Sequence, residues 1–119
     1  MECQAMKHTM QLQPSPFEKI KAGTKTIELR LYDEKRRKIR IGDTIEFTHS
    51  ECVNETVAVK VLDLFTFDSF ESLYQALPLL ECGYTENDID TASSADMELY
   101  YSKKKQKEYG VVGIKIALL

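Results

Sequence analysis

Residues 23–30 read Gly-Thr-Lys-Thr-Ile-Glu-Leu-Arg, and this stretch decides how the fold is interpreted. Ile27 and Leu29 alternate with Glu28 and Arg30, which is the period of a β-strand. We therefore expect a half-buried strand here, with its apolar side chains facing inward. Glu28 and Arg30 would project from the opposite face about 7 Å apart, close enough to pair with each other or to share a ligand.

The residues before this strand carry the signals of a short helix. Ser15 is the expected N-cap, Pro16 the first helical residue, and Glu18 closes a capping box. Gly23 suits the left-handed position that ends helices. A helix this short does not form alone. We therefore expect it to be held by packing on a larger body.

Other parts of the chain predict a sheet with one helical insert. Apolar and polar residues alternate as in strands over residues 7–13, 44–48, 57–65 and 111–118. Residues 67–109 carry helix signals instead, with Asp68, Ser93 or Ser94, and Ser102 as caps and Gly110 as a terminator. Short, numerous strands and one helical insert predict an α+β fold: a small, mostly antiparallel β-barrel with helices on its rim.

The length and composition are those of one folded domain. The chain has 119 residues, of which 43% are apolar and 29% charged. We expect residues 7–119 to form the domain and residues 1–6 to be a disordered or frayed extension. No apolar run approaches the ~20 residues of a membrane helix, and no leader pattern is visible. The expected location is the cytoplasm, with no membrane partner.

The cysteines and histidines do not form a recognisable metal or disulfide pattern. Cys3, Cys52 and Cys82 are odd in number and include no CxxC pair, and only His8 and His49 accompany them. We therefore expect free thiols in a reducing compartment, no metal and no cofactor.

The net charge of −3 is unevenly distributed along the chain. Residues 1–60 hold eleven Lys and Arg against nine Asp and Glu, whereas residues 61–119 hold five against ten. A net charge describes solubility better than it describes a local binding face. The acidic balance therefore does not exclude a nucleic-acid ligand.

Two basic clusters are candidates for a track that attracts a polyanion backbone. They consist of Lys35, Arg36, Arg37, Lys38 and Arg40, and of Lys103, Lys104 and Lys105. For the first cluster the alternative is a solvated hairpin loop. Tyr100 and Tyr101 precede the second, and aromatic side chains beside lysines suit base stacking. Both tyrosines cannot face one side of a helix, so one of them belongs to the core.

The pattern G-x-K-x-x-E-x-R, formed by Gly23, Lys25, Glu28 and Arg30, resembles the signature of the ASCH domain family (activating signal cointegrator homology). The flanking segments PSPFEKIKAG, IGDTIEF and YGVVGIKI match as well. The resemblance implies a PUA-like β-barrel that binds RNA or a modified nucleotide in a cleft around this pattern. The candidate ligand-binding residues are Gly23, Lys25, Glu28, Arg30, Tyr100 and Tyr101.

The same resemblance implies an alternative, because the family also includes small bacterial amidohydrolases that act on N4-acetylcytidine. Their catalytic Lys corresponds to Lys25, and the position of their catalytic Thr holds Glu28 here, which puts the Thr-dependent mechanism in doubt. If the protein is an enzyme, its expected catalytic residues are Lys25 and Glu28. Glu71 and Glu98 are candidates for the distal Glu of that mechanism.

The residue types of the pattern suit either activity. Lys25 could act as a base when desolvated, or stay charged beside Glu28 and bind a phosphate or carbonyl. Arg30 can grip a phosphate or a base edge with two donors. Glu28 could accept from an exocyclic amine or activate a water molecule. The structural alternative is that Glu28 and Arg30 pair and orient the strand.

A third hypothesis is a protein-interaction module. Acidic residues crowd residues 81–98, including Glu86, Asp88 and Asp90, and would form its docking face. No other feature of the sequence indicates a protein partner.

Overall fold

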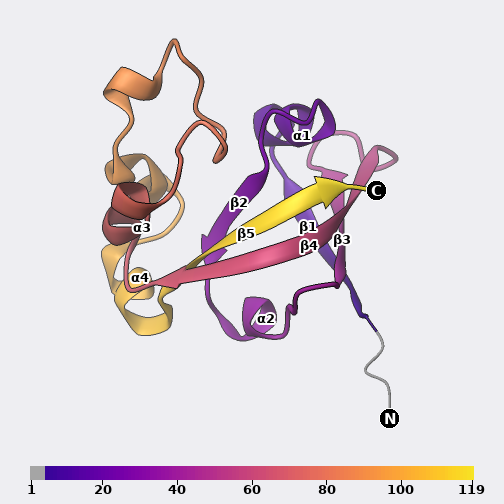
Figure 1. Cartoon of the computed structure of the whole chain (residues 1–119), viewed down its shortest axis with the longest axis horizontal. Coiled ribbons are helices and arrows are strands. Elements are labelled where there is room, and N and C mark those ends of the chain that lie inside the picture. The colour runs from indigo at the N-terminus through magenta and orange to yellow at the C-terminus, as the bar shows by residue number, and fades with distance from the viewer. Residues whose placement is uncertain (1–4) are drawn as a thin grey trace.

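The computed structural model describes residues 5–119 of the chain (Figure 1). The strands are β1 (Lys7–Leu12), β2 (Ile27–Leu31), β3 (Thr44–His49), β4 (Thr56–Phe67) and β5 (Val111–Leu118). The helices are α1 (Pro14–Lys21), α2 (Glu34–Arg37), α3 (Phe70–Ala76) and α4 (Lys103–Tyr109), with 3-10 turns η1 (Ile89–Thr91) and η2 (Ser94–Leu99). No helix among the described residues is long and apolar enough to cross a membrane.

The expected frayed extension covers residues 1–6, of which residues 1–4 lie outside the described residues. Met6 is attached to the domain at two points. Its N–H donates to the Asp43 carboxylate at 3.0 Å, and its carbonyl accepts the N–H of Thr44 at 2.9 Å.

A single curled sheet holds the five strands in the order β1-β3-β4-β5-β2. β1 runs parallel to β3, and the other three neighbouring pairs are antiparallel. This arrangement confirms the prediction of an α+β fold with a mostly antiparallel barrel. β1 and β2 are the edges of the sheet, so the barrel is open along one seam. Two side chains cross the seam at 2.7 Å each: Arg30 donates to the Gln11 carbonyl and Lys35 to the Thr9 carbonyl.

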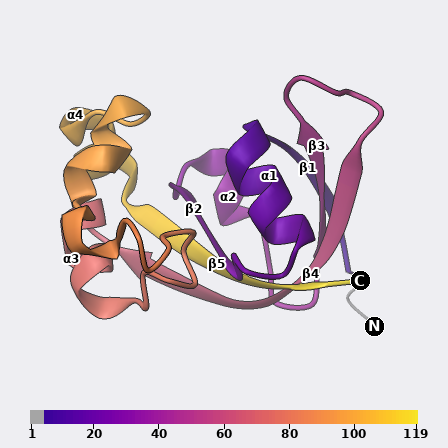
Figure 2. The same ribbon diagram turned by 90° about the horizontal axis from the view of Figure 1, so that it is seen from above.

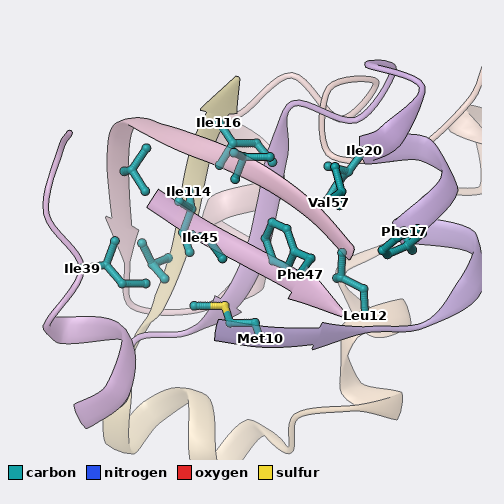
Figure 3. Close-up of a cluster of buried hydrophobic side chains, with 13 residues drawn as sticks. Met10, Leu12, Phe17, Ile20, Ile39, Ile45, Phe47, Val57, Ile114 and Ile116 are labelled. Atoms are coloured by element: carbon teal, nitrogen blue, oxygen red, sulfur yellow. The ribbon is translucent and has the colours of Figure 1, made fainter. Parts of the chain in front are cut away.

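The inner face of the sheet carries the main hydrophobic cluster (Figure 3). Phe47 of β3 and Val59 of β4 are completely buried in it, and Phe17 and Ile20 of α1 pack against it. Full burial of such a side chain stabilises the fold by about 1.5–3 kcal/mol. This packing explains how the short helix α1 is held at one end of the barrel, opposite α2 (Figures 1 and 2).

The insert between β4 and β5 packs on the outside of the curled sheet (Figure 2). Phe70 and Leu73 of α3 are fully buried there, in a second cluster with Ile27, Leu29 and Leu31 of β2. The apolar face of β2 is therefore buried outside the barrel. The expectation that these residues face inward was wrong, because the insert supplies a second core that covers them.

The polar face of β2 points to the inside of the barrel. In the sheet, Glu28 lies opposite Ile114 of β5, and Arg30 lies opposite Val112 of β5. Residues that lie opposite each other on adjacent strands project from the same face of the sheet. Ile114 and Val112 belong to the inner cluster. Glu28 is only 3% exposed, so this polar face of the strand is buried and not open to solvent.

The start of α1 differs from the prediction. The helix begins at Pro14, and its N-cap, Gln13, makes no side-chain capping bond. Proline is well placed at the first helical position because its missing N–H is not needed there. Ser15 is therefore not the cap. Gly23, with φ at +82°, follows the helix end as predicted.

The helices of the insert follow local capping signals. The cap of α3 is Ser69, which accepts the N–H of Ser72, and not the expected Asp68. Ser93 caps η2 with a capping box, and Ser102 caps α4. Serine and aspartate are both good caps, so the one-residue error reflects near-equal local signals.

The basic run at residues 35–40 does not form a hairpin loop. Its first half is the helical turn α2, capped by Asp33, whose carboxylate accepts the N–H of Arg36 at 3.1 Å. A hairpin requires neighbouring strands, but β2 and β3 are separated in the sheet by β5 and β4. The run therefore belongs to a crossing connection at the end of the barrel.

Candidate functional site

Three charged residues of the signature pattern form a buried triad. Lys25 lies in the loop after α1, and Glu28 and Arg30 lie on the inner face of β2. The Lys25 Nζ atom is 3.0 Å from Glu28 Oε1, and the Arg30 Nε atom is 2.7 Å from Glu28 Oε2. The side chains of Lys25 and Arg30 are only 11% and 13% exposed. Two cations around one carboxylate leave a net positive charge in this buried place.

The environment of Glu28 keeps its carboxyl group ionised. Burial by itself would raise the pKa of Glu28, but the charges and hydrogen bonds of Lys25 and Arg30 outweigh it and lower the pKa below 4.5. Burial would likewise lower the pKa of Arg30, but the charge of Glu28 raises it. Both carboxylate oxygens are engaged. Glu28 is therefore a weak base, and its geometry suits the orientation of its two cationic partners.

A cavity of about 490 Å³ lies at the triad, between α1 and the insert. Its lining combines the end of β1 and α1 (Gln11, Leu12, Gln13, Ser15, Pro16, Lys19), the signature region (Lys25, Glu28, Leu29, Arg30) and the insert (Tyr74, Cys82, Gly83, Tyr84, Asp88, Asp96, Met97, Leu99, Tyr100, Tyr101). Its size falls within the range of ordinary small-molecule sites, about 300–1,000 Å³.

Gly83 of the insert packs closely against the Lys25 side chain. With φ at +114°, it lies so close that a Cβ atom there would be 3.2 Å from Lys25 Cδ. Gly83 is itself attached to α1, because Lys19 donates to its carbonyl at 2.6 Å. Glycine at position 83 therefore allows both the backbone conformation and the close approach of Lys25.

The insert contributes a chain of hydroxyl groups to the cavity wall. The hydroxyl of Tyr84 donates to the Asp96 carboxylate at 2.6 Å and lies 2.7 Å from the hydroxyl of Tyr74. Burial and the neighbouring Asp96 raise the pKa of Tyr84 well above its usual range. Tyr84 therefore stays protonated and donates to Asp96, which ties two parts of the insert together.

The sequence prediction missed several of these lining residues. Ser15 and Lys19 are one helical turn apart on the face of α1 opposite its buried residues, and this spacing is a signal that could have indicated them. Tyr74, Tyr84 and Asp96 come from the insert. No local pattern distinguishes them, because only tertiary packing brings them to the signature region.

The two predicted tyrosines both line the cavity but differ in burial. Tyr100 is 66% exposed at the rim. Tyr101 is half-buried and stacked on Phe70, with ring centroids 5.7 Å apart. This arrangement agrees with the expectation that one of them is part of the core. Gly23 ends α1 and is not part of the cavity lining.

The predicted basic track is divided among several structural roles. Lys35 bridges the barrel seam, and Arg36 pairs with Asp33 at 3.0 Å. Arg37 donates to two backbone carbonyls and stacks on the ring of Tyr32. The remaining basic side chains are exposed: Lys38, Arg40, Lys103, Lys104 and Lys105. None of these residues lines the triad cavity.

A second cavity of about 970 Å³ lies elsewhere on the insert. Arg37 and Lys103, from the two basic clusters, both line it. Glu71 and Glu98, the candidates for a distal catalytic carboxylate, also line this cavity and not the one that contains Lys25. Apart from Glu28, the carboxylates that line the cavity of Lys25 are those of Asp88 and Asp96.

The acidic residues proposed as a docking face are exposed along the insert. Glu86 and Asp90 are exposed side chains. Asp88 is exposed too, but its carboxylate is used in a turn, where it accepts the N–H and hydroxyl of Thr85.

One group of side chains has the composition of a metal site. Glu18, His49 and Glu55 each place a potential ligand atom within 4.8 Å of the others. However, His49 Nδ1 accepts the N–H groups of Glu51 and Cys52, so the ring proton must lie on Nε2. Neither ring nitrogen then offers a free lone pair, and the arrangement does not suit a cation.

An open, curled five-stranded sheet, with a buried charged triad in a cavity beside its seam, defines a small α+β domain of the PUA-like type. The chain belongs to the ASCH domain family, which matches residues 10–119. This family is generally related to RNA binding. The resemblance recognised in the signature pattern is thus confirmed.

Solved structures agree with this assignment. The chain is similar to the crystal structure of hypothetical protein PH0355, with 34% identity and a TM-score of 0.79 over 96% of this chain and 100% of that one. Protein PF0455 from Pyrococcus furiosus is 33% identical, with a TM-score of 0.70 over 96% and 98%. ASCH from Zymomonas mobilis shares the fold at 12% identity and a TM-score of 0.66, over 93% and 66%. No curated protein matches the chain.

Proposed function

We propose that the triad cavity binds a nucleotide, either as part of RNA or as a free modified nucleotide. The buried triad carries this proposal. Lys25 uses one of its three donors on Glu28, and Arg30 uses only its Nε and Nη2 groups within the described chain. The remaining donors and the net positive charge suit a phosphate or a polar base edge.

Glu28 acts as a positioning residue in this proposal. Its lowered pKa and its two engaged oxygens argue against a role as general base. Removing the partner of a buried charge is costly, so burying two cations here requires a carboxylate between them. Glu28 therefore keeps the ligand-binding cations in place.

Exposed side chains around the cavity could contact a ligand longer than one nucleotide. Tyr100 offers an exposed ring at the cavity rim for stacking on a base. The exposed lysines of α4 and of the 35–40 run contribute a diffuse attraction to a phosphate backbone, which weakens as salt concentration rises. The exposed free thiol of Cys52 suits a reducing compartment, so the proposed place of action is the cytoplasm.

Calorimetric titration with the four ribonucleoside monophosphates and a short single-stranded RNA tests the proposal. We expect binding by the wild type and a loss of at least tenfold in affinity for Lys25→Ala. The matched control is Lys60→Ala, which removes an exposed lysine from β4, away from the cavity. Absence of binding at low salt, or equal losses in the two variants, would reject the proposal.

The amidohydrolase remains a second candidate, because Lys25 shares its cavity with the carboxylates of Asp88 and Asp96. Hydrolysis of N4-acetylcytidine would release acetate and cytidine, and chromatography detects both products. Turnover by the wild type that is lost in Lys25→Ala, and retained in Lys60→Ala, would support this candidate. Turnover no faster than that of Lys25→Ala would reject it.

A further inference from the structure

Strand β2, which carries Glu28 and Arg30 of the triad, has a free edge. The backbone N–H of Tyr32 donates to the Gly110 carbonyl, and the backbone N–H of Ile116 donates to the Thr26 carbonyl. The backbone groups of the even-numbered residues of β2 therefore bond to β5. Backbone groups alternate in direction along a strand. The N–H and C=O groups of Leu29 must therefore point away from β5, towards the open seam of the barrel.

These two backbone groups of Leu29 have no hydrogen-bond partner within residues 5–119. Leu29 is nevertheless buried, with 6% of its surface exposed. Its side chain packs in the outer cluster with Phe70 and Leu73, and the residue lines the triad cavity. Buried backbone groups without a partner are rare in folded proteins. The pair is therefore available to a ligand that enters the cavity.

The surroundings of Leu29 limit what this ligand can be. The N–H of Ile27 on the same edge is already taken by the Glu81 carbonyl at 3.0 Å. Arg30 occupies the Gln11 carbonyl on the facing edge. An added peptide strand needs several successive free groups in reach. The N–H and C=O groups of Leu31 also point away from β5, but Leu31 does not line the cavity, so within the cavity only the pair of Leu29 is offered. A flat group with one complementary donor and one acceptor fits the edge better than a strand.

We propose that the N–H and C=O groups of Leu29 read the Watson–Crick edge of a nucleobase whose phosphate or sugar lies towards Lys25 and Arg30. This inference rests on the proposed nucleotide-binding function of the same cavity. Every standard base has a neighbouring donor and acceptor on that edge, such as the N3–H and O4 groups of uracil. The site therefore requires an unblocked base edge and does not select one base.

A comparison of modified nucleotides tests the proposal without changing the protein. Uridine 5′-monophosphate is compared with its N3-methyl derivative, which lacks the edge donor, and with its 5-methyl derivative, which carries the same methyl group away from that edge. Ribose 5-phosphate measures binding without a base. We expect N3-methylation to weaken binding at least tenfold and 5-methylation to change it less than threefold.

Nuclear magnetic resonance of the ¹⁵N-labelled protein supplies the second measurement. The Leu29 amide proton should shift downfield on binding of uridine 5′-monophosphate and remain in place with ribose 5-phosphate. Equal affinities for the N3-methyl and 5-methyl derivatives, an unmoved Leu29 amide, or binding of other nucleotides but not uridine 5′-monophosphate would overturn the inference. If none of the four ribonucleoside monophosphates binds, the proposed function itself fails.

Discussion

The two cavities that the insert lines differ in how they hold charge. In the larger, Lys103 is 86% exposed and lies 3.6 Å from Glu98. In the smaller, Lys25 is 11% exposed and lies 3.0 Å from a Glu28 side chain that is 4% exposed. Exposed pairs contribute little to stability, whereas a buried charge is costly unless it is paired and bonded. The smaller cavity is therefore the one whose buried charges call for a functional explanation, and this is why the proposed binding site is placed there and not in the larger cavity.

The largest expected effect comes from breaking the buried triad. Glu28→Gln removes the only negative charge between two buried cations, so we expect the free energy of unfolding to fall by about 3–5 kcal/mol. Urea denaturation followed by circular dichroism measures it. A loss below about 1 kcal/mol would show that water in the cavity screens Lys25 and Arg30. The buried triad would then not differ in energy from the exposed pair of Lys103 and Glu98.

The same carboxyl group should make stability depend on pH. The pKa of Glu28 is lower in the folded protein than its ordinary value of 4.5, so the folded state binds fewer protons than the unfolded state below that value. The stabilisation by Glu28 is therefore present above about pH 4.5 and is lost as the pH falls through the folded pKa. Denaturation between pH 7 and pH 3 should show a steeper loss for the wild type than for Glu28→Gln. Parallel curves would contradict this assignment.

A smaller effect is expected from the backbone beside Lys25. Gly83→Ala places a methyl group 3.2 Å from Lys25 Cδ at a φ of +114°, and we expect a loss of about 2 kcal/mol in stability and weaker nucleotide binding. Gly23→Ala is the matched control, because its φ is +82° but no atom lies within 4 Å of the added carbon. Equal nucleotide affinity of the two variants would show that Gly83 does not position Lys25.

The smallest effect is expected in the larger cavity. Glu98→Gln removes the partner of the exposed Lys103, and the change in unfolding free energy should stay within about 0.5 kcal/mol. Denaturation under the conditions used for Glu28→Gln measures it. If Glu98→Gln lowered the unfolding free energy as much as Glu28→Gln does, the burial of a charged pair would not explain its contribution to stability.

Much of the fold could be predicted from local patterns. The alternation of Ile27 and Leu29 with Glu28 and Arg30 identified the strand and the pairing of its charged residues. This alternation could not predict which face lies inside, because that depends on α3, which begins at Phe70, well after β2 ends at Leu31. The period of a strand defines two faces but does not say what covers each.

In the candidate site, too, contacts between residues close in sequence could be predicted, and contacts between distant segments could not. The proximity of Glu28 and Arg30 follows from their spacing on one strand, whereas the contact between Lys25 and Gly83 joins segments far apart in sequence. Ser15 was interpreted as a helix cap because Ser-Pro is a strong local signal, but the helix begins at Pro14, two residues before the expected Pro16. This shift leaves Ser15 in the cavity lining.

The open seam of the barrel has a consequence for the behaviour of the protein at high concentration. Unpaired sheet edges invite pairing with a strand of another molecule and lead to aggregation. Here the cationic side chains of Arg30 and Lys35 occupy carbonyl groups of β1, and Leu29 lines a cavity. Arg30 thus blocks part of this edge and also belongs to the proposed binding site, so we expect its replacement to reduce solubility as well as affinity.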